Sequence, residues 1–426
     1  MPEGAALRLD VTGEGNARTM GVFAGDSEIR LAGWSLDAEE VRDVLDEVRE
    51  TLKQIHSVAG MSLDLTAQRS AEAVDKLLYF ARGVGYGLFG ERLGDLYEQA
   101  ELRAPGAFDP SVPARIVEVT APPDFSYPFE LLTWRDPENL PQEQRQDPAL
   151  RARALLGMAA IVRRRFDSKQ EEGEEQGEGE GEGEGRARIE NEETLPVTVF
   201  RNPSLTGAKK EVDYFTDIKG LVKVYGPWPQ EGALAKSAAA RHLMNSCIDL
   251  DGKPRQPVAV LHLACHCSTT GEAANLHYLN VGGEYGKVLL GDLKKELTDP
   301  QVAEAPVPRP LVFLNACGTA VPQMADRSSF TKFLLRKKFL GVLGTLCDIS
   351  DTVAAHFAMV FYEALLSGKT VGEAMHEARW HLMDRHRNPL GLLYTFYGNV
   401  DLKVSRPRTG GIVPACEAPA PTRPRT

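Results

Sequence analysis

The sequence predicts an α/β fold: a mainly parallel sheet flanked by helices, joined to a small N-terminal α/β unit. From residue 195 onward, continuous apolar runs such as VAVLHLA and LVFLNA are separated by amphipathic stretches. Strands of this kind are buried on both faces, which is typical of a parallel sheet with helices on either side. The 426 residues are 42% hydrophobic, enough to fill two structural units.

The N-terminal unit begins with short runs that alternate apolar and polar residues, at 6–11 and again near 20–23. The period then becomes helical over 36–55 and 71–102. The connection RAPGAFDPSVPA contains three prolines and leads into RIVEVTA, a predicted strand at 115–121. We therefore expect an N-terminal unit over 1–112 and a second unit over 113–405.

Within the second unit we predict a helical stretch over residues 148–166. The run EEGEEQGEGEGEGEG follows, which cannot bury apolar surface and repels itself. We expect a disordered acidic insertion at about 167–192. The segment after Val404 is rich in Pro and Arg and predicts a disordered tail over 406–426.

The remainder of the second unit alternates strands and helices in a regular order. The expected strands cover 195–200, 221–226, 258–264, 311–316 and 341–346, and the first two helices cover 209–218 and 232–245. Active sites of such sheets lie at the carboxyl ends of the strands. Chemically interesting residues stand at two of these ends, Cys265-His266-Cys267 and Cys317-Gly318-Thr319.

Charge and composition exclude several classes of protein. The formal net charge is −11, but residues 171–184 hold eight Glu, which leaves about −3 on the rest, so no nucleic acid partner is expected. The N-terminus lacks a basic start followed by an apolar run, and no apolar stretch is long enough to span a membrane. The expected location is the cytoplasm. The six cysteines form no CxxC pair and are expected to be reduced: 247, 265, 267, 317, 347 and 416.

A cysteine and a histidine at neighbouring strand ends are the parts that a thiol nucleophile needs. The imidazole forms the thiolate and later protonates the leaving amine, both near pH 7. Cys317 stands 51 positions after His266, a separation that leaves room for a crossover between adjacent parallel strands. Caspase-type proteases place their histidine about 50 residues before the nucleophile.

Residues 256–404 resemble the CHAT family, caspase-like peptidases related to separases within clan CD. The matching motifs are VLHLACH, PLVFLNACGTA, FLLRKKFLGVLGTLCDISD, AAHFAMVFYEALLSGKTVGEAMHEARWHL and FYGNVDL. YPFELL, at 127–132, resembles the entry of the same domain. Motif order and spacing are more specific than a lone Cys and a lone His.

The resemblance implies that His266 and Cys317 form a catalytic dyad. The backbone N–H groups of Cys267 and Cys317 would then form the oxyanion hole. The family usually has Gly after the catalytic histidine, where this chain has Cys267, and a side chain there can obstruct a close backbone approach. The segment TLCDISD resembles the stretch that shapes the S1 pocket, so Asp348 or Asp351 would bind a basic P1 side chain. Both aspartates flank a predicted helix start, where Ser350 or Asp351 could instead simply cap the N-terminus.

The resemblance also implies the activity: a cytoplasmic cysteine endopeptidase that cleaves protein substrates without a cofactor. Members of the family are typically effectors activated by a sensor or partner, often in bacterial defence or cell death. Residues 1–112 carry no recognised motif; they could restrain the protease, recruit a substrate or dock a sensor or activator protein. Arg186 and Arg188 offer basic sites for self-cleavage.

Three other interpretations compete with this one. The chain could be a catalytically silent caspase-like adaptor or scaffold. His262, Cys265, His266 and Cys267 could be metal ligands, but their spacing fits no common structural zinc pattern, and no metal is expected. Cys265 and Cys267 could form a redox switch, although one intervening residue on a strand strains a local disulfide.

Overall fold

The computed structural model describes most of both predicted units. The described residues are 7–13, 18–24, 30–36, 38–60, 62–103, 115–122, 127–166, 188–189, 194–229, 236–245, 258–269, 277–282, 286–296, 309–316 and 330–404. Most of the acidic insertion, the whole tail after residue 404 and the connection at 104–114 lie outside them. Within the insertion only Arg188–Ile189 is described, as strand β6, which pairs with β15 at Lys403–Val404.

A first sheet of five strands combines residues from both sides of the predicted boundary at 112/113. Its order is β3-β2-β1-β4-β5, in which β1, β4 and β5 are mutually parallel and β2 and β3 extend the edge antiparallel. The strands are β1 Leu7–Thr12, β2 Arg18–Ala24, β3 Arg30–Leu36, β4 Arg115–Ala121 and β5 Ala160–Phe166. The helices that follow them are α1 Ala38–Ala59, α2 Ala67–Phe89 and α3 Leu93–Arg103, then the short α4 Gln142–Gln146, α5 Pro148–Ala152 and α6 Leu156–Ala159.

The predicted helix at 148–166 is wrong in its second half. Only α5 and α6 are helical, and AIVRRRF forms β5 in parallel register with β4, from Arg115–Ala160 to Ala121–Phe166. The apolar positions Ile161 and Val162 are β-branched and buried, and such side chains favour a strand when a partner strand is available. Pairing with β4 thus outweighs the helical periodicity of the sequence, and the chain changes from helix to strand at Ala160.

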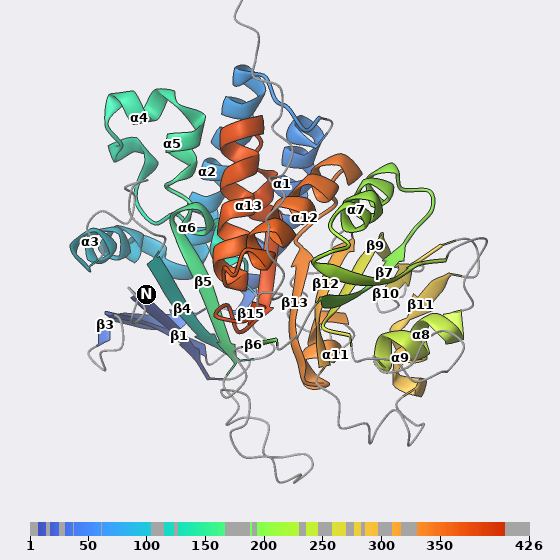
Figure 1. Cartoon of the computed structure of the whole chain (residues 1–426). Coiled ribbons are helices and arrows are strands. Elements are labelled where there is room, and N and C mark those ends of the chain that lie inside the picture. The colour runs from blue at the N-terminus through green and yellow to red at the C-terminus, as the bar shows by residue number, and fades with distance from the viewer. Residues whose placement is uncertain are drawn as a thin grey trace, which may run out of the picture.

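The second sheet holds the functional site and confirms the prediction of a mainly parallel sheet flanked by helices (Figure 1). Its strands follow the order β8-β7-β9-β12-β13-β14; all neighbours are parallel except the last pair, and β10 and β11 extend it beside the end of β9. The strands are β7 Leu195–Arg201, β8 Val222–Trp228, β9 Val260–Thr269, β10 His277–Asn280, β11 Lys287–Leu289, β12 Arg309–Ala316, β13 Phe339–Thr345 and β14 Tyr394–Gly398. The helices are α7 Thr206–Asp217, α8 Lys236–Met244, α9 Leu290–Glu296, α11 Phe330–Arg336, α12 Asp351–Leu366 and α13 Val371–His386.

Alternate residues of the central strands bury into two different cores. Leu311 and Phe313 belong to the core that α7, α12 and α13 cover, whereas Val312 and Leu314 belong to the core of α8, α9 and α11. The first of these cores continues without a break into the N-terminal unit, as far as Leu7. Period-two alternation therefore assigns each strand residue to one face of the sheet.

A buried ion network ties the two sheets together. Arg164, on β5, makes a bidentate pair with Glu130, which stands in the YPFELL segment; its Nη1 lies 2.6 Å from Oε1. Thr395 on β14 donates to the same Oε1 at 2.9 Å, and Arg379 on α13 lies 3.7 Å from it. Burial by itself raises the pKa of Glu130. The guanidinium groups of Arg164, foremost, and Arg379 lower that pKa by a larger amount, so the net pKa is lowered and the carboxylate is charged.

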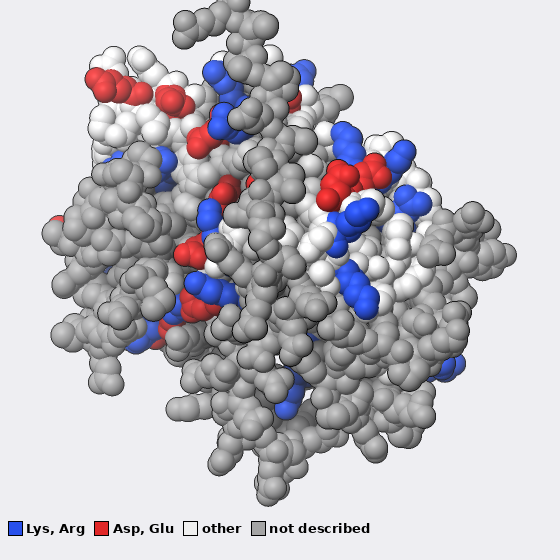
Figure 2. All heavy atoms as spheres, viewed as in Figure 1, with Lys and Arg blue, Asp and Glu red and all other residues white. Residues whose placement is uncertain are grey.

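The described surface carries mixed charge. Figure 2 shows Lys and Arg interspersed with Asp and Glu on the visible face, including the region over α7. Among the described helices none has the length and apolar character needed to cross a bilayer.

Candidate active site

His266 stands near the end of β9, where side chains alternate between the two faces. Leu261, Leu263 and Cys265 pack into the core of α8, α9 and α11. His262 faces the other way, toward Tyr362 of α12, and His266 follows it by four residues on the same face. His266 is partly exposed, as a residue that meets substrate has to be.

The pocket beside His266 lies at the carboxyl ends of the central strands, as expected for a sheet of this class. Its volume is small, about 40 Å³, and it is open to solvent at its mouth. Its walls come from β9, β12 and β13 and from the first turns of α7 and α12. The lining residues are Leu205, Ala208, Glu211, Ala264, Cys265, His266, Asn315, Thr345, Ile349, Asp351 and Ala354.

Cys317 itself lies outside the described residues. The strand that leads to it is described to its end, and its register with β9 runs from Leu311–Val260 to Ala316–Cys265. The residues that immediately precede Cys317 and His266 in the chain are therefore side-by-side partners in adjacent parallel strands.

Cys267 points away from the pocket. Its side chain is partly buried and packs against the core of α8, α9 and α11, on the same side as Cys265. Cys267 is not among the residues that line the pocket. Cys267 stands where the family usually has Gly, and its side chain is thus directed to the face of the sheet opposite His266.

The four residues weighed as metal ligands do not converge. His262 and His266 share one face of β9, whereas Cys265 and Cys267 share the other. His262 is fully buried, and its ring nitrogens contact other side chains: Nδ1 contacts the hydroxyl of Tyr362, and Nε2 contacts the carboxylate of Glu211. Cys265 and Cys267 are both thiols, together with Cys347.

The two candidate S1 aspartates lie in different surroundings. Asp351 lines the pocket, and its Oδ2 accepts hydrogen bonds from the N–H and hydroxyl of Thr206, at 3.0 and 3.1 Å, and from the N–H of Gly207 at 3.4 Å. Partial burial disfavours its charge, but these hydrogen bonds at the start of α7 outweigh that effect and lower the pKa of Asp351. Asp348 is exposed and is not part of the pocket lining.

Asp351 is a cap, but of a different helix from the one that its sequence position suggested. It begins α12 and caps α7, more than 140 residues earlier in the chain. The two helices meet closely here, because a Cβ at Gly207 would overlap the backbone of Asp351. The carboxylate thereby holds the two helix starts together on one side of the pocket.

Sequence analysis missed a buried polar network beneath the pocket. Glu211 of α7 is 3% exposed; its Oε2 lies 2.5 Å from His262 Nε2 and accepts from Asn315 Nδ2 at 2.9 Å. Asn315 also donates to the carbonyl of Ala354 at 3.2 Å and accepts from the hydroxyl of Tyr394 at 2.7 Å. The network joins β9, β12, β14, α7 and α12.

This network orients the floor of the site through its hydrogen bonds. The hydroxyl of Tyr362 lies 3.0 Å from His262 Nδ1, and burial raises the pKa of that tyrosine well above its usual value, so it remains a donor. On the other side of the ring, the 2.5 Å contact between His262 Nε2 and Glu211 Oε2 continues the chain of polar contacts. Asn315 stands two residues before Cys317, and its partners on α7, α12 and β14 hold it in place.

Arg188 is the one candidate self-cleavage residue that the structure describes in part. Its backbone belongs to β6 and pairs with Lys403 of β15. Arg186 lies outside the described residues.

The sequence model of one protein family, described as the CHAT domain, matches residues 125–409. A probable protease of Vitiosangium sp. (strain GDMCC 1.1324) is 35% identical over 91 residues, which are 21% of this chain and 12% of that protein. The match thus spans about an eighth of the relative's length.

Two solved structures share parts of the architecture. The separase–securin complex of Saccharomyces cerevisiae aligns with a TM-score of 0.48 and 10% identity, over 93% of this chain and 30% of the other. The complex of the pro- and mature domains of RgpB from Porphyromonas gingivalis aligns with a TM-score of 0.39 and 10% identity, over 80% of this chain and 78% of the other. At this identity neither likeness bears on the chemistry of the site.

Proposed function

Because the chain belongs to the CHAT domain family, a family of caspase-like cysteine peptidases, we propose that it is an endopeptidase that cleaves proteins with Cys317 as nucleophile and His266 as acid and base. The backbone N–H groups of Cys267 and Cys317 stabilise the oxyanion. The proposed reaction uses no cofactor.

The observation that carries the proposal is the register of β9 and β12 at the pocket. The last described pair, Ala316 and Cys265, directly precedes the two proposed catalytic residues, and His266 lines an open pocket. A Cys–His dyad needs two side chains from adjacent strand ends that reach a common space. The side chain of Cys267 packs on the face of the sheet opposite His266, so it does not fill the space beside the proposed dyad.

The proposed reaction follows from these positions. His266 removes the proton from the Cys317 thiol, and the thiolate attacks the scissile carbonyl carbon to form a tetrahedral oxyanion. When the C–N bond breaks, His266 returns the proton to the leaving amine, and an acyl-enzyme remains. A water molecule, deprotonated by His266, then attacks the thioester and releases the acid and the free thiol.

A preference for Arg or Lys at P1 is part of the proposal, and Asp351 is the better supported of its two candidates. It lies in the pocket with His266, and the hydrogen bonds from α7 all reach its Oδ2. A charged carboxylate on the wall of a pocket favours a cationic side chain.

The test is covalent labelling of the purified protein with an acyloxymethylketone probe that carries Arg at P1. Intact mass should show one probe per wild-type chain and none on Cys317→Ala or His266→Ala. If probes with several P1 residues all fail to label the wild-type protein, the catalytically silent scaffold becomes the better hypothesis. If they label Cys317→Ala equally, the dyad is misassigned.

Self-processing after Arg186 or Arg188 remains a prediction. The β6–β15 pairing at Arg188 would have to open before an active site could take that segment in extended form. Wild type should accumulate two fragments that together account for the intact mass, whereas Cys317→Ala should stay whole. If both proteins keep their own full-length mass after prolonged incubation, the self-cleavage prediction is wrong.

Activation by a partner that binds residues 1–112 also remains a prediction, as does a role in bacterial defence or cell death. The N-terminal unit is well placed to affect the protease, because β1 pairs with β4 and both units share one core. A partner that shifts this unit would therefore move elements that continue into the pocket-bearing domain.

A further inference from the structure

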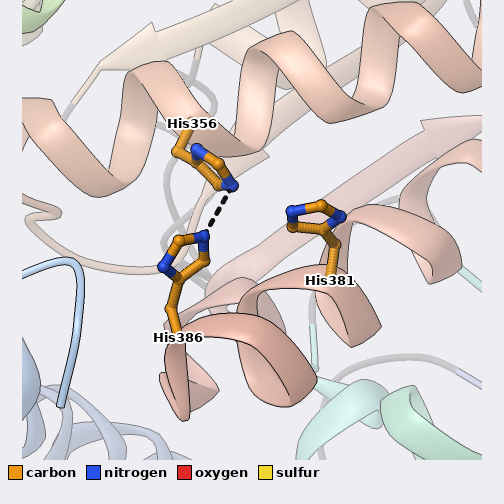
Figure 3. A group of neighbouring side chains, drawn as sticks. All are labelled: His356, His381 and His386. Carbon is orange, nitrogen blue, oxygen red and sulfur yellow. Dashed lines mark hydrogen bonds between the residues drawn. The ribbon is translucent and has the colours of Figure 1, made fainter. Parts of the chain in front are cut away.

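Three histidines converge between two helices, away from the proposed dyad. His356 stands on α12 and His381 and His386 on α13, and Figure 3 shows their rings directed into the space between the helices. One nitrogen from each ring can be chosen so that all three lie within 4.8 Å of one another. All three side chains are partly buried, neither sealed in the core nor fully exposed to solvent.

The pair His356 and His386 already has its nitrogens at ligand spacing. Their Nε2 atoms lie 3.0 Å apart, marked by the dashed line in Figure 3, and the ring centroids are 4.4 Å apart. Two imidazole nitrogens on one tetrahedral zinc ion, each about 2.0–2.1 Å from it, stand roughly 3.4 Å apart. The centroid of His381 lies 5.1 Å from that of His356, so small side-chain rotations bring it to the same centre.

A carboxylate supports the cluster from the side that a metal would not occupy. Asp64, in the connection between α1 and α2, has its Oδ1 2.8 Å from His386 Nδ1. Ligating histidines commonly donate their other ring N–H to a carboxylate, which fixes the tautomer and makes the ligand more basic. Here this bond leaves Nε2 of His386 directed at His356 as a lone-pair donor.

The connection that carries Asp64 is itself anchored to the end of α13. Leu65 N–H donates to the carbonyl of His386 at 2.9 Å, and Asn388 Nδ2 lies 3.1 Å from the carbonyl of Ser62. The cluster thus joins three segments, α12, α13 and the α1–α2 connection.

The protonation state of the cluster suits a cation. Burial, with His386 and His381 nearby, lowers the pKa of His356 to about 4, and burial likewise lowers the pKa of His381. The rings of His356 and His381 are therefore neutral near pH 7, as metal ligands have to be. Other charged groups that face the cluster are of both signs: Asp64, Glu377, Lys210 and Arg385.

We infer that His356, His381 and His386 form a binding site for a divalent transition-metal ion, with Zn²⁺ as the ion of choice. Three imidazoles and one water complete a tetrahedral shell. The ion clamps α12 and α13 to the N-terminal unit through Asp64. Since α12 begins at Asp351, five residues before His356, the clamp also fixes the helix that forms one wall of the pocket.

The test measures Zn²⁺ binding in a Cys317→Ala background, so that a thiolate in the proposed dyad cannot contribute. Isothermal titration of the full chain, stripped of metal beforehand, should show one site. His356→Gln, His381→Gln and His386→Gln should each weaken it by more than tenfold, and Asp64→Asn by about tenfold. His56→Gln, which changes a partly buried histidine of α1 outside the cluster, serves as the matched control and should bind as the parent does.

Three further measurements keep the inference open to refutation if a variant unfolds. Circular dichroism must show parental secondary structure for each variant, and Co²⁺ should give the strong visible absorption of a tetrahedral site with the parent only. Zn²⁺ should also raise the Tm of the parent and not that of the His356→Gln variant. Equal Zn²⁺ affinity in the folded parent and histidine variants, or no binding by the parent, would overturn the site.

Discussion

Single residues at the pocket have structural and chemical roles that have to be separated experimentally. Asp351 both caps α7 and faces the space that we assign to the P1 side chain. Loss of a helix cap commonly costs about 1 kcal/mol and would affect all substrates, whereas loss of a charge partner would affect only basic ones. A ratio of rates between substrates therefore isolates the second role.

We predict that Asp351→Asn lowers kcat/KM for a peptide with Arg at P1 by at least tenfold relative to the same peptide with norleucine at P1. Asn retains an oxygen to accept from Thr206 and Gly207 but lacks the charge that pairs with a guanidinium. Asp348→Asn is the control, since this exposed residue is not in the pocket lining, and its ratio should match that of wild type. An unchanged ratio in Asp351→Asn would assign basic specificity, if present, to other residues.

The proposed His–Cys dyad and the pocket network differ in how visible they are in the sequence. His266 and Cys317 stand at the ends of two apolar strands within recognisable motifs, so the order of the elements was enough to propose them together. Glu211 is one charged residue on an amphipathic helix, and nothing nearby in the chain marks it as buried. Its partners His262 and Asn315 are 51 and 104 residues away, and only the fold brings them to it.

At the scale of elements, strands with continuous apolar runs were predicted well. The predicted strand at 115–121 has the bounds of β4, and the predicted strand at 195–200 differs from β7 by one residue. The errors fall where pairing with a neighbouring strand, not the local sequence pattern, determines the secondary structure. The residues of β5 were expected to be helical, and β3 was not predicted. The histidine cluster escaped notice because its members lie on two helices, and those on α13 are five positions apart rather than one turn.

Helix α13 carries an acid-sensitive element in His376. Its Nε2 lies 3.0 Å from the carbonyl of Met158, and burial, together with the nearby Arg379 and Arg153, lowers the pKa of His376 to about 4. The unfolded chain, with a histidine pKa near 6.5, binds this proton more readily. The contribution of His376 to the stability of the folded state is thus complete above about pH 6.5 and is lost as the pH falls toward 4.

We predict that the free energy of unfolding decreases between pH 7 and pH 5, and that His376→Gln makes this decrease smaller. Urea unfolding at several pH values measures both, and the comparison uses the slope with pH, not the absolute stability of the variant. His356, with a pKa also lowered to about 4, should contribute in the same direction. A slope identical to that of wild type in His376→Gln would show that its burial has no such effect.

At the scale of the whole molecule, the two sheets are held by a shared core and by the Arg164–Glu130 pair. Both side chains are almost completely buried, at 6% and 2% exposure. A buried pair of this kind adds little net stability over apolar residues, but removal of one partner leaves an uncompensated charge. The pair therefore specifies how the YPFELL segment, β5 and β14 fit together.

We predict that Glu130→Ala lowers the free energy of unfolding by about 3–5 kcal/mol. Urea unfolding followed by circular dichroism measures this change. Glu50→Ala is the control, because its ion pair with Lys53 is exposed on both sides and such pairs contribute at most about 1 kcal/mol. A loss of less than 1 kcal/mol for Glu130→Ala would mean that the network does not hold the sheets together.

The central claim is that Cys317 is the nucleophile of this chain, and peptide mapping after labelling tests it most directly. Wild-type protein treated with the Arg acyloxymethylketone probe is digested, and the modified residue is identified by tandem mass spectrometry among the six cysteines. The account predicts a single adduct on Cys317 that disappears in His266→Ala. An adduct on Cys265, Cys267 or Cys347, or one on Cys317 that persists at the same rate without His266, would contradict it.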